Sequence, residues 1–205
     1  MPVDSTAVIS LSSNWVGSLR SVMAPTYGPR RYGQDVRTFS DLFRNVMQLA
    51  YVTDDLDVAC DYFEQTLGTV DCLKTYKSSL NGIAVVDGVT AEEWIIDVAL
   101  VNAGATNFEL IKPISGSVDL YRSAIRPGVP ATFHHVGYRI PDFDEATEIL
   151  AANGKTWAQY GHMKGGLRFG YVDMTAELGH FIEFMDLERG GEMHFAALEA
   201  KSNER

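Results

Sequence analysis

The stretch MQLAYVTDDLDVACDYFEQTLG, residues 47–68, recurs in altered form as HHVGYRIPDFDEATEILAANGK, residues 134–155. Tyrosine, aspartate and alanine return at matching places, and most apolar positions agree. The matched pairs are Tyr51 with Tyr138, Asp55 with Asp142, Asp57 with Asp144 and Ala59 with Ala146. Self-similarity over this length predicts two copies of one supersecondary unit.

Each copy predicts a short alternating strand and then a helix. Asp55 or Asp142 can cap the helix, apolar residues follow at helical spacing, and Gly68 or Gly154 marks its end. Three further strands follow in each copy, so each module reads βαβββ. They are predicted at 70–76, 94–101 and 107–111, and at 157–162, 168–173 and 180–185. Residues 81–93 have no counterpart in the second copy and are expected to form an extra loop.

This pattern divides the chain into two modules with three flanking segments. A Ser-, Pro-, Gly- and Arg-rich extension either wraps the domain or a partner subunit, or forms a disordered tail. The final segment can be helical. In order, the segments are the extension 1–44, the first module 45–113, a linker 114–131, the second module 132–187 and a tail 188–205.

Strand alternation places polar side chains on the face opposite the helices. Four of them occupy equivalent places in the two modules, at the first and last strands: Gln48, Glu109, His135 and Glu183. If each sheet is curved, these groups converge, and their nitrogen and oxygen donors suit Zn²⁺, Ni²⁺, Co²⁺, Mn²⁺ or Fe²⁺. A hydrogen-bonded core histidine and solvated strand glutamates would give the same pattern.

Residues 45–187 resemble the vicinal oxygen chelate superfamily, which includes glyoxalase I, methylmalonyl-CoA epimerase, extradiol dioxygenases and antibiotic-resistance proteins. The segments HHVGYRIPDFDEATEIL, HFIEFMDL and MQLAYVTDDLDVACDYFEQTLG carry the resemblance. It implies an α+β fold in which two βαβββ modules form an open, cup-like mixed sheet with flanking helices. It also implies one divalent metal ion per site, with Gln48, Glu109, His135 and Glu183 as ligands.

The ligand order Gln, Glu, His, Glu looks like the glyoxalase I pattern. The resemblance therefore implies a metal-dependent lyase or isomerase that transfers a proton on a small oxygenated metabolite, through an enediolate-like anion stabilised by the metal. Glu183 is the first candidate for the base and Glu109 the second. An extradiol-type dioxygenase uses two histidines and one carboxylate, so it is disfavoured. A non-catalytic, resistance-type binding protein of the same fold stays open.

The outer pocket departs from glyoxalase I. Where that family places an arginine and an asparagine near its first two ligands, this chain has Val52 and Pro113, so glutathione dependence is not expected. Arg139 faces inward, and either pairs with a carboxylate or binds an anionic ligand.

A Gly-rich turn in the second module has further polar neighbours. His162, Arg168 and Tyr171 flank this turn, MKGGLRFG, and are candidate substrate-binding residues. An ordinary hairpin would explain the turn equally well.

The composition limits which partners and which cellular compartment are expected. With 27 acidic and 17 basic residues and a net charge of −10, neither nucleic acid nor an anionic membrane is expected to bind. No apolar run approaches the roughly 20 residues of a membrane span, and no secretory signal is evident. Cys60 and Cys72 are expected to be reduced, as in a cytoplasmic protein. The expected partners are a small-molecule substrate and a second copy in a homodimer.

Overall fold

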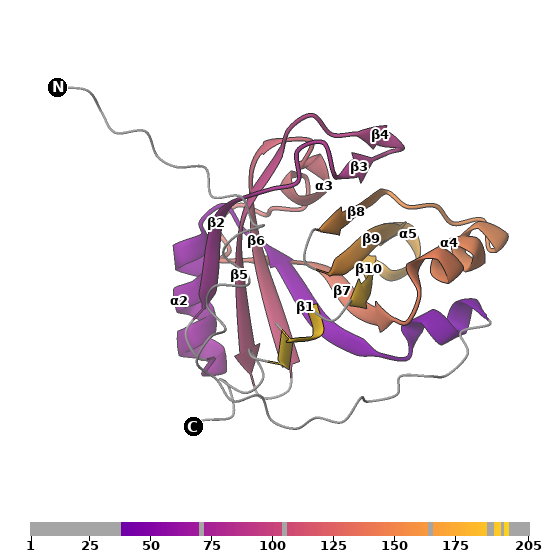
Figure 1. Cartoon of the computed structure of the whole chain (residues 1–205). Helices are drawn as coiled ribbons and strands as arrows, with labels where there is room; N and C mark the ends of the chain where they lie inside the picture. The colour runs from indigo at the N-terminus through magenta and orange to yellow at the C-terminus, as the bar shows by residue number, and fades with distance from the viewer. Residues whose placement is uncertain are drawn as a thin grey trace.

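Ten strands form one curled, open sheet in the computed structural model, with the two long helices on its outer face (Figure 1). The structure describes residues 38–69, 72–103, 106–163, 166–187, 191–193 and 195–196. The predictions for 1–37 and 197–205 lie outside this part of the chain. The α+β fold with a cup-like mixed sheet is confirmed.

The elements follow the order that the repeat predicts, with a few additions. The strands are β1 Val46–Val52, β2 Leu73–Ser79, β3 Val85–Val86, β4 Val89–Thr90, β5 Trp94–Ala103, β6 Thr106–Gly116, β7 Thr132–Ile140, β8 Gln159–Met163, β9 Leu167–Met174 and β10 His180–Leu187. The helices are the 3-10 helix η1 Phe39–Phe43 and the α-helices α2 Leu56–Leu67, α3 Asp119–Arg122, α4 Phe143–Ala152 and α5 Thr175–Leu178.

The two modules meet at an antiparallel pair, β1 with β7, in the middle of the sheet. The strand order is β2-β5-β6-β1-β7-β10-β9-β8-β3-β4, and the last strand of each module runs parallel to its first. Ala50 on β1 therefore lies between Glu109 and His135, while Gly137 on β7 lies between Gln48 and Glu183. This matching register is what an internal two-fold repeat requires.

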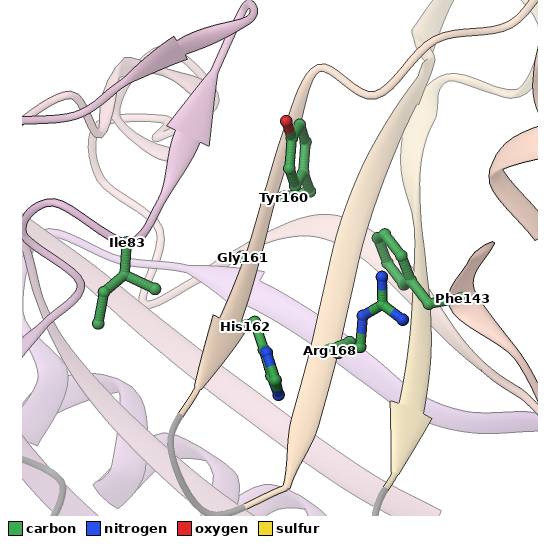
Figure 2. Close-up of a pocket in the computed structure, with 6 residues that line it drawn as sticks. All are labelled: Ile83, Phe143, Tyr160, Gly161, His162 and Arg168. Atoms are coloured by element: carbon green, nitrogen blue, oxygen red, sulfur yellow. The ribbon is translucent and has the colours of Figure 1, made fainter.

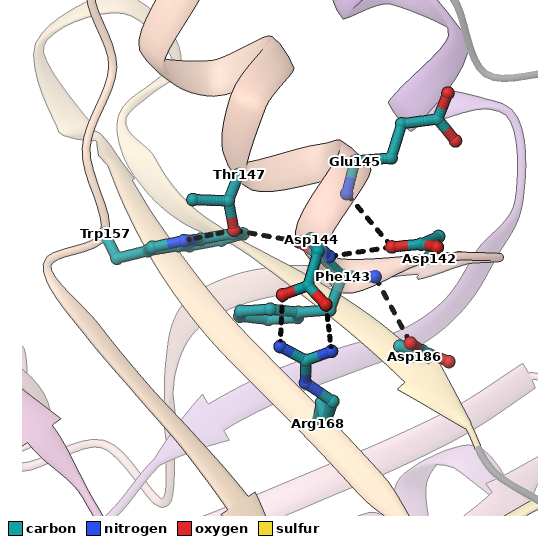
Figure 3. Close-up of polar contacts among 8 residues, drawn as sticks. All are labelled: Asp142, Phe143, Asp144, Glu145, Thr147, Trp157, Arg168 and Asp186. Carbon is teal, nitrogen blue, oxygen red and sulfur yellow. Dashed lines mark hydrogen bonds and ion pairs between the residues drawn. The ribbon is translucent and has the colours of Figure 1, made fainter.

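Both long helices begin at the predicted aspartates. The Asp55 and Asp142 carboxylates each accept hydrogen bonds from the backbone N–H groups two and three residues on, at 2.8–3.2 Å. Figure 3 shows the cap at Asp142. Helix α2 ends at Gly68, which has φ of 63° as a left-handed C-cap requires. The second helix ends earlier than predicted, with Asn153 as its C-cap and Gly154 just beyond at φ of 69°.

Three apolar clusters follow the alternation of the strands. Under α2, Leu49 and Tyr51 pack with Phe63, and under α4 the equivalent Val136 and Tyr138 pack with the second helix. The third cluster lies on the concave face, and it includes residues from β5, β6, β9, β10, α3 and the segment before β5. The two faces of the sheet are therefore separate cores, as the alternating pattern predicts.

Residues 81–93 form a hairpin and not the expected loop. Asp87 and Gly88, with φ of 48° and 79°, close a tight turn between β3 and β4. Asp-Gly between short apolar runs is a common hairpin signal because both residues tolerate positive φ. Strand β3 pairs with β8, so this insertion of the first module extends the edge of the second.

The other strand and linker boundaries also shift. Strand β2 runs from Leu73 to Ser79, later than the predicted 70–76, and residues 70 and 71 lie outside the description. The linker is not only a connection, since its helix α3 buries Tyr121 in the concave cluster. Among the described residues, no helix is both long and apolar enough to cross a bilayer.

The end of the N-terminal extension belongs structurally to the second module. Phe43 in η1 packs edge-on against Phe184 and Tyr138, with ring centroids 5.4 and 5.2 Å apart. Residues 191–193 and 195–196 of the tail are helical. Cys60 and Cys72 are both free thiols.

Candidate metal centre

The first and last strands of both modules bring three potential ligands together on the concave face. Nε2 of His135 lies 3.2 Å from Oε2 of Glu183 and 3.6 Å from Oε2 of Glu109. One potential ligand atom from each of these residues lies within 4.8 Å of the other two. The groups belong to β6, β7 and β10 of a single chain, so the cluster forms without a second copy.

Gln48 is held beside this cluster by a ladder of amides. Its Nε2 donates to Oδ1 of Asn107 at 2.8 Å, and Nδ2 of Asn107 donates to Oδ1 of Asn102 at 2.6 Å. With its nitrogen engaged in this ladder, Gln48 keeps its oxygen for another partner. A Cβ at Gly137 would come within 3.4 Å of that oxygen, 3.0 Å of Cβ of Gln48 and 2.6 Å of Cε of Met185, so a larger residue there would displace one or both of these side chains.

Burial dominates the electrostatics of the cluster. It raises the pKa of Glu183 to about 8, although a hydrogen bond from Tyr171 acts in the opposite direction. Burial and then the charge of Glu183 raise the pKa of Glu109 well above its ordinary value. Burial lowers the pKa of His135 to about 3. Two carboxylates in so dry a site require protons or a cation to offset their desolvation.

The residues fit a divalent cation. Oε2 of Glu109 is buried and has no hydrogen-bond partner, although it faces the imidazole of His135. Such an orphaned acceptor is costly unless a ligand satisfies it. One imidazole nitrogen, two carboxylates and an amide oxygen form a donor set that suits borderline metals such as Zn²⁺, Ni²⁺ or Co²⁺.

His134, which the sequence analysis did not single out, supports His135 from behind. The two Nδ1 atoms are 2.9 Å apart, and Nε2 of His134 lies 3.1 Å from the carbonyl oxygen of Leu120 in α3. Burial lowers the pKa of His134 to about 3, so the ring is neutral at pH 7. The adjacent histidines are visible in the sequence, but the carbonyl partner comes from the linker and could not be foreseen.

Tyr171 borders the cluster beside a second group of hydrogen-bonded side chains. It lies opposite Glu183 in the β9–β10 ladder, and its ring centroid is 4.9 Å from that of His135. Next to it, Tyr121 of α3 accepts a hydrogen bond from Nε2 of Gln159 at 2.9 Å. Neither Tyr121 nor Gln159 was predicted, because both reach the site through contacts distant in sequence.

Arg139 faces the concave side and forms an ion pair with Glu192 of the tail. Of its two predicted alternatives, this is the paired state. Near the positions where glutathione-binding groups would stand, Val52 is fully buried in the concave cluster and Pro113 lies on β6.

His162 and Arg168 do not border the cluster, unlike Tyr171, with which they were grouped. Arg168 lies on the helix-bearing face, where it forms a bidentate ion pair with Asp144 at 2.6 and 3.0 Å and stacks on Phe143 (Figure 3). The reason is strand alternation: residues 168 and 171 are an odd number apart and point to opposite faces. The side chains of His162 and Arg168 line a separate hollow of about 410 Å³ with Tyr160 (Figure 2).

Residues 47–171 match the family profile described as the Glyoxalase/Bleomycin resistance protein/Dioxygenase superfamily, and the chain belongs to this family. Among solved structures, it is similar to methylmalonyl-CoA epimerase from Mycobacterium tuberculosis, with a TM-score of 0.53 and 17% identity, over 72% of this chain and 90% of that one. It is also similar to a hypothetical protein from Bacillus halodurans C-125, with a TM-score of 0.52 and 12% identity, over 71% and 95% of the two chains. These likenesses concern the fold. No curated protein matches the sequence.

Proposed function

We propose that this chain is a metal-dependent isomerase or lyase that transfers a proton on a small oxygenated metabolite. The observation that carries the proposal is the convergence of Glu109, His135 and Glu183 from both modules, with one buried carboxylate oxygen left without a hydrogen-bond partner. Gln48, Glu109, His135 and Glu183 would hold the ion. A bound divalent ion in such a site stabilises negative charge that develops on substrate oxygens.

Glu109 is the better supported base, which reverses the order expected from the sequence. Its side chain is 17% exposed against 6% for Glu183, so it is the carboxylate that an entering substrate can reach. Glu183 lies opposite Tyr171 in the β9–β10 ladder, and its Oε2 is 3.2 Å from Nε2 of His135. In the proposed reaction, Glu109 takes a proton from a substrate carbon and returns it, while Glu183 stays in place.

The surroundings support proton transfer more than oxygenation. An iron oxygenase needs a second histidine, and His134 already directs Nδ1 to His135 and Nε2 to a carbonyl. The concave face beside the site is lined by apolar and aromatic side chains, which limit the access of water to a carbanion-like species.

A homodimer stays a prediction, which light scattering would check.

The experiment first measures metal binding and then measures the exchange of a carbon-bound proton for deuterium. The chain is purified, stripped, titrated with Zn²⁺, Ni²⁺, Co²⁺ and Mn²⁺, and incubated in D₂O with hydroxyketones, hemithioacetals and a methylmalonyl thioester. The thioester is included because a structural neighbour is a methylmalonyl-CoA epimerase. We expect metal-dependent exchange of a carbon-bound proton for deuterium in at least one substrate, seen by NMR.

A base variant and a control variant show whether the exchange depends on Glu109. Glu109→Gln is expected to abolish it, whereas Glu177→Gln, an exposed glutamate paired with Lys155, is expected to leave it unchanged. Tight binding of a substrate without any exchange would favour a binding protein, and metal-dependent oxygen uptake with catechols would favour a dioxygenase. Either result would contradict the proposal.

A further inference from the structure

We propose that His134 is a positioning residue for the metal centre. It fixes the tautomer of His135, so that Nε2 of His135 presents a lone pair between the carboxylates of Glu109 and Glu183. The inference concerns the same site as the proposed function and rests on it for its purpose, but its geometric part can be tested without any metal.

The His134 ring is fixed on both sides. It is 2% exposed, and it stacks on Phe181 with ring centroids 5.0 Å apart and an interplanar angle of 18°. On another side, the ring of Tyr121 has its centroid 5.3 Å away. Helix α3 therefore holds the imidazole with an aromatic ring and, through Leu120, with a carbonyl oxygen. These contacts fix the plane of the ring, and the hydrogen bonds at its two nitrogens choose between its two flipped orientations.

The position of each proton follows from its partner. A carbonyl oxygen can only accept, so the contact between Nε2 of His134 and Leu120 places a proton on that Nε2. In a neutral ring, Nδ1 of His134 is then an acceptor. The 2.9 Å contact between the two Nδ1 atoms therefore needs its proton on Nδ1 of His135. Nε2 of His135, left without a proton, carries the lone pair.

This tautomer is the one a metal needs. In the other tautomer, Nε2–H of His135 would donate to Glu183 across the 3.2 Å contact and could not bind a cation. Without a partner on Nδ1, that competing hydrogen bond would be the better arrangement for a metal-free ring. His134 supplies the partner, and thus keeps the ligand atom available. Metal-bound histidines generally have such a partner on the other nitrogen.

Two substitutions separate positioning from packing. A glutamine at 134 can accept from His135 with its oxygen and donate to Leu120 with its nitrogen, whereas a phenylalanine fills space but can do neither. The variants are therefore His134→Gln and His134→Phe. His162→Phe is the matched control, because it makes the same exchange on the opposite face of the sheet.

The experiment uses the full chain with ¹⁵N-labelled histidine. In metal-free wild type, long-range ¹H–¹⁵N spectra are expected to show His135 protonated on Nδ1. Zn²⁺ affinity is then measured by competition with a chelating dye, with thermal unfolding to verify folding. His134→Phe is expected to weaken Zn²⁺ binding by about 10–100-fold. His134→Gln should recover most of the loss and keep the Nδ1–H form.

Each result decides the matter. Protonation of His135 on Nε2 in metal-free wild type, or wild-type affinity in a folded His134→Phe, would overturn the inference. If His134→Phe does not fold, His134→Gln decides alone, and a shift to the Nε2–H form or a 10-fold loss of affinity there would overturn it. If wild type binds no metal, the proposed function fails, while the spectra still test the tautomer.

Discussion

The two modules offer equivalent ligands but support them differently. The first module contributes Gln48 and Glu109, and of these two side chains it holds the Gln48 amide with a hydrogen bond to Asn107. The second presents His135 and Glu183 and braces both, through His134 and Tyr171. Equivalent register has thus not produced equivalent surroundings.

The source of the difference lies outside the repeat. Helix α3 from the linker contributes Tyr121 and the Leu120 carbonyl, and the inserted hairpin pairs with β8 of the second module. Both additions support the His135–Glu183 side. The second module therefore acts as the fixed half of the site, and the first keeps the more accessible carboxylate. A duplicated fold can divide binding from proton transfer in this way.

The largest effect on turnover should come from replacing each of the two glutamates in turn by glutamine. Glu109→Gln is expected to lower kcat at saturating Zn²⁺ by about 10²–10⁴, because an amide cannot take the proton. It should also weaken metal binding, because a neutral amide replaces a charged ligand. Glu183→Gln is expected to lower metal affinity as well as kcat. Rates and Zn²⁺ affinity measured on both variants check this. Unchanged turnover in Glu109→Gln would return the role of base to Glu183.

The next largest effect should follow removal of the one nitrogen ligand. His135→Ala is expected to weaken metal binding by more than about 100-fold, beyond what loss of an outer partner costs. Gln48→Ala should cost about 10-fold, because a neutral amide oxygen is a weaker donor than imidazole. Elemental analysis and dye competition measure both, with His162→Ala as the control. Equal metal content in wild type and His135→Ala would remove His135 from the site.

A smaller effect is expected from the amide ladder of the first module. Asn107→Leu removes the acceptor for Nε2 of Gln48 and leaves that amide free to turn its nitrogen toward the site. We expect metal affinity to fall by roughly 10-fold, at the lower end for an outer partner. Asn102→Leu, one step further along, should cost less. Dye competition at one pH compares them, and equal losses would contradict a graded ladder.

The smallest effect concerns pH and the metal-free protein. Between pH 7 and 8 the unfolded chain has released most of the protons of His134 and His135, and the folded rings are neutral as well. Folded Glu183, with its pKa near 8, still keeps a proton that the unfolded chain releases near pH 4.5. The free energy of unfolding should therefore fall as pH rises through this window, by up to about 1.4 kcal/mol per pH unit for each proton. Below pH 6.5 the buried His134 and His135 act in the opposite direction, because only the unfolded chain gains their protons.

Metal should remove that fall, since it binds the ionised carboxylates. Urea unfolding at pH 7.0, 7.5 and 8.0, with and without Zn²⁺, tests this, and Glu183→Gln should flatten the metal-free curve. A flat curve in the metal-free wild type would show that the carboxylates are not desolvated as the structure has them.

Local sequence patterns predicted the helix starts, the strand faces and the meeting of the candidate ligands. The caps at Asp55 and Asp142 and the faces of the central strands depend on neighbours within a few residues, so sequence periodicity reveals them. Register then follows from the repeat, and with it the meeting of Gln48, Glu109 and His135 on one surface.

What could not be predicted depends on partners distant in the chain. The carbonyl that fixes His134 comes from α3, the partner of Arg139 is Glu192 in the tail, and β3 pairs with a strand of the other module. Single-sequence patterns hold no information on such pairings. The grouping of Arg168 with Tyr171 was wrong for a local reason, because side chains three residues apart on one strand point to opposite faces of the sheet.

The proposed function requires one divalent ion between the modules, bound by both. Anomalous diffraction from crystals soaked in Zn²⁺, recorded across the zinc absorption edge, tests it most directly. We expect one peak per chain within bonding distance of Nε2 of His135, the carboxylates of Glu109 and Glu183, and Oε1 of Gln48. A fully occupied peak elsewhere, or none here at a saturating concentration, would contradict it.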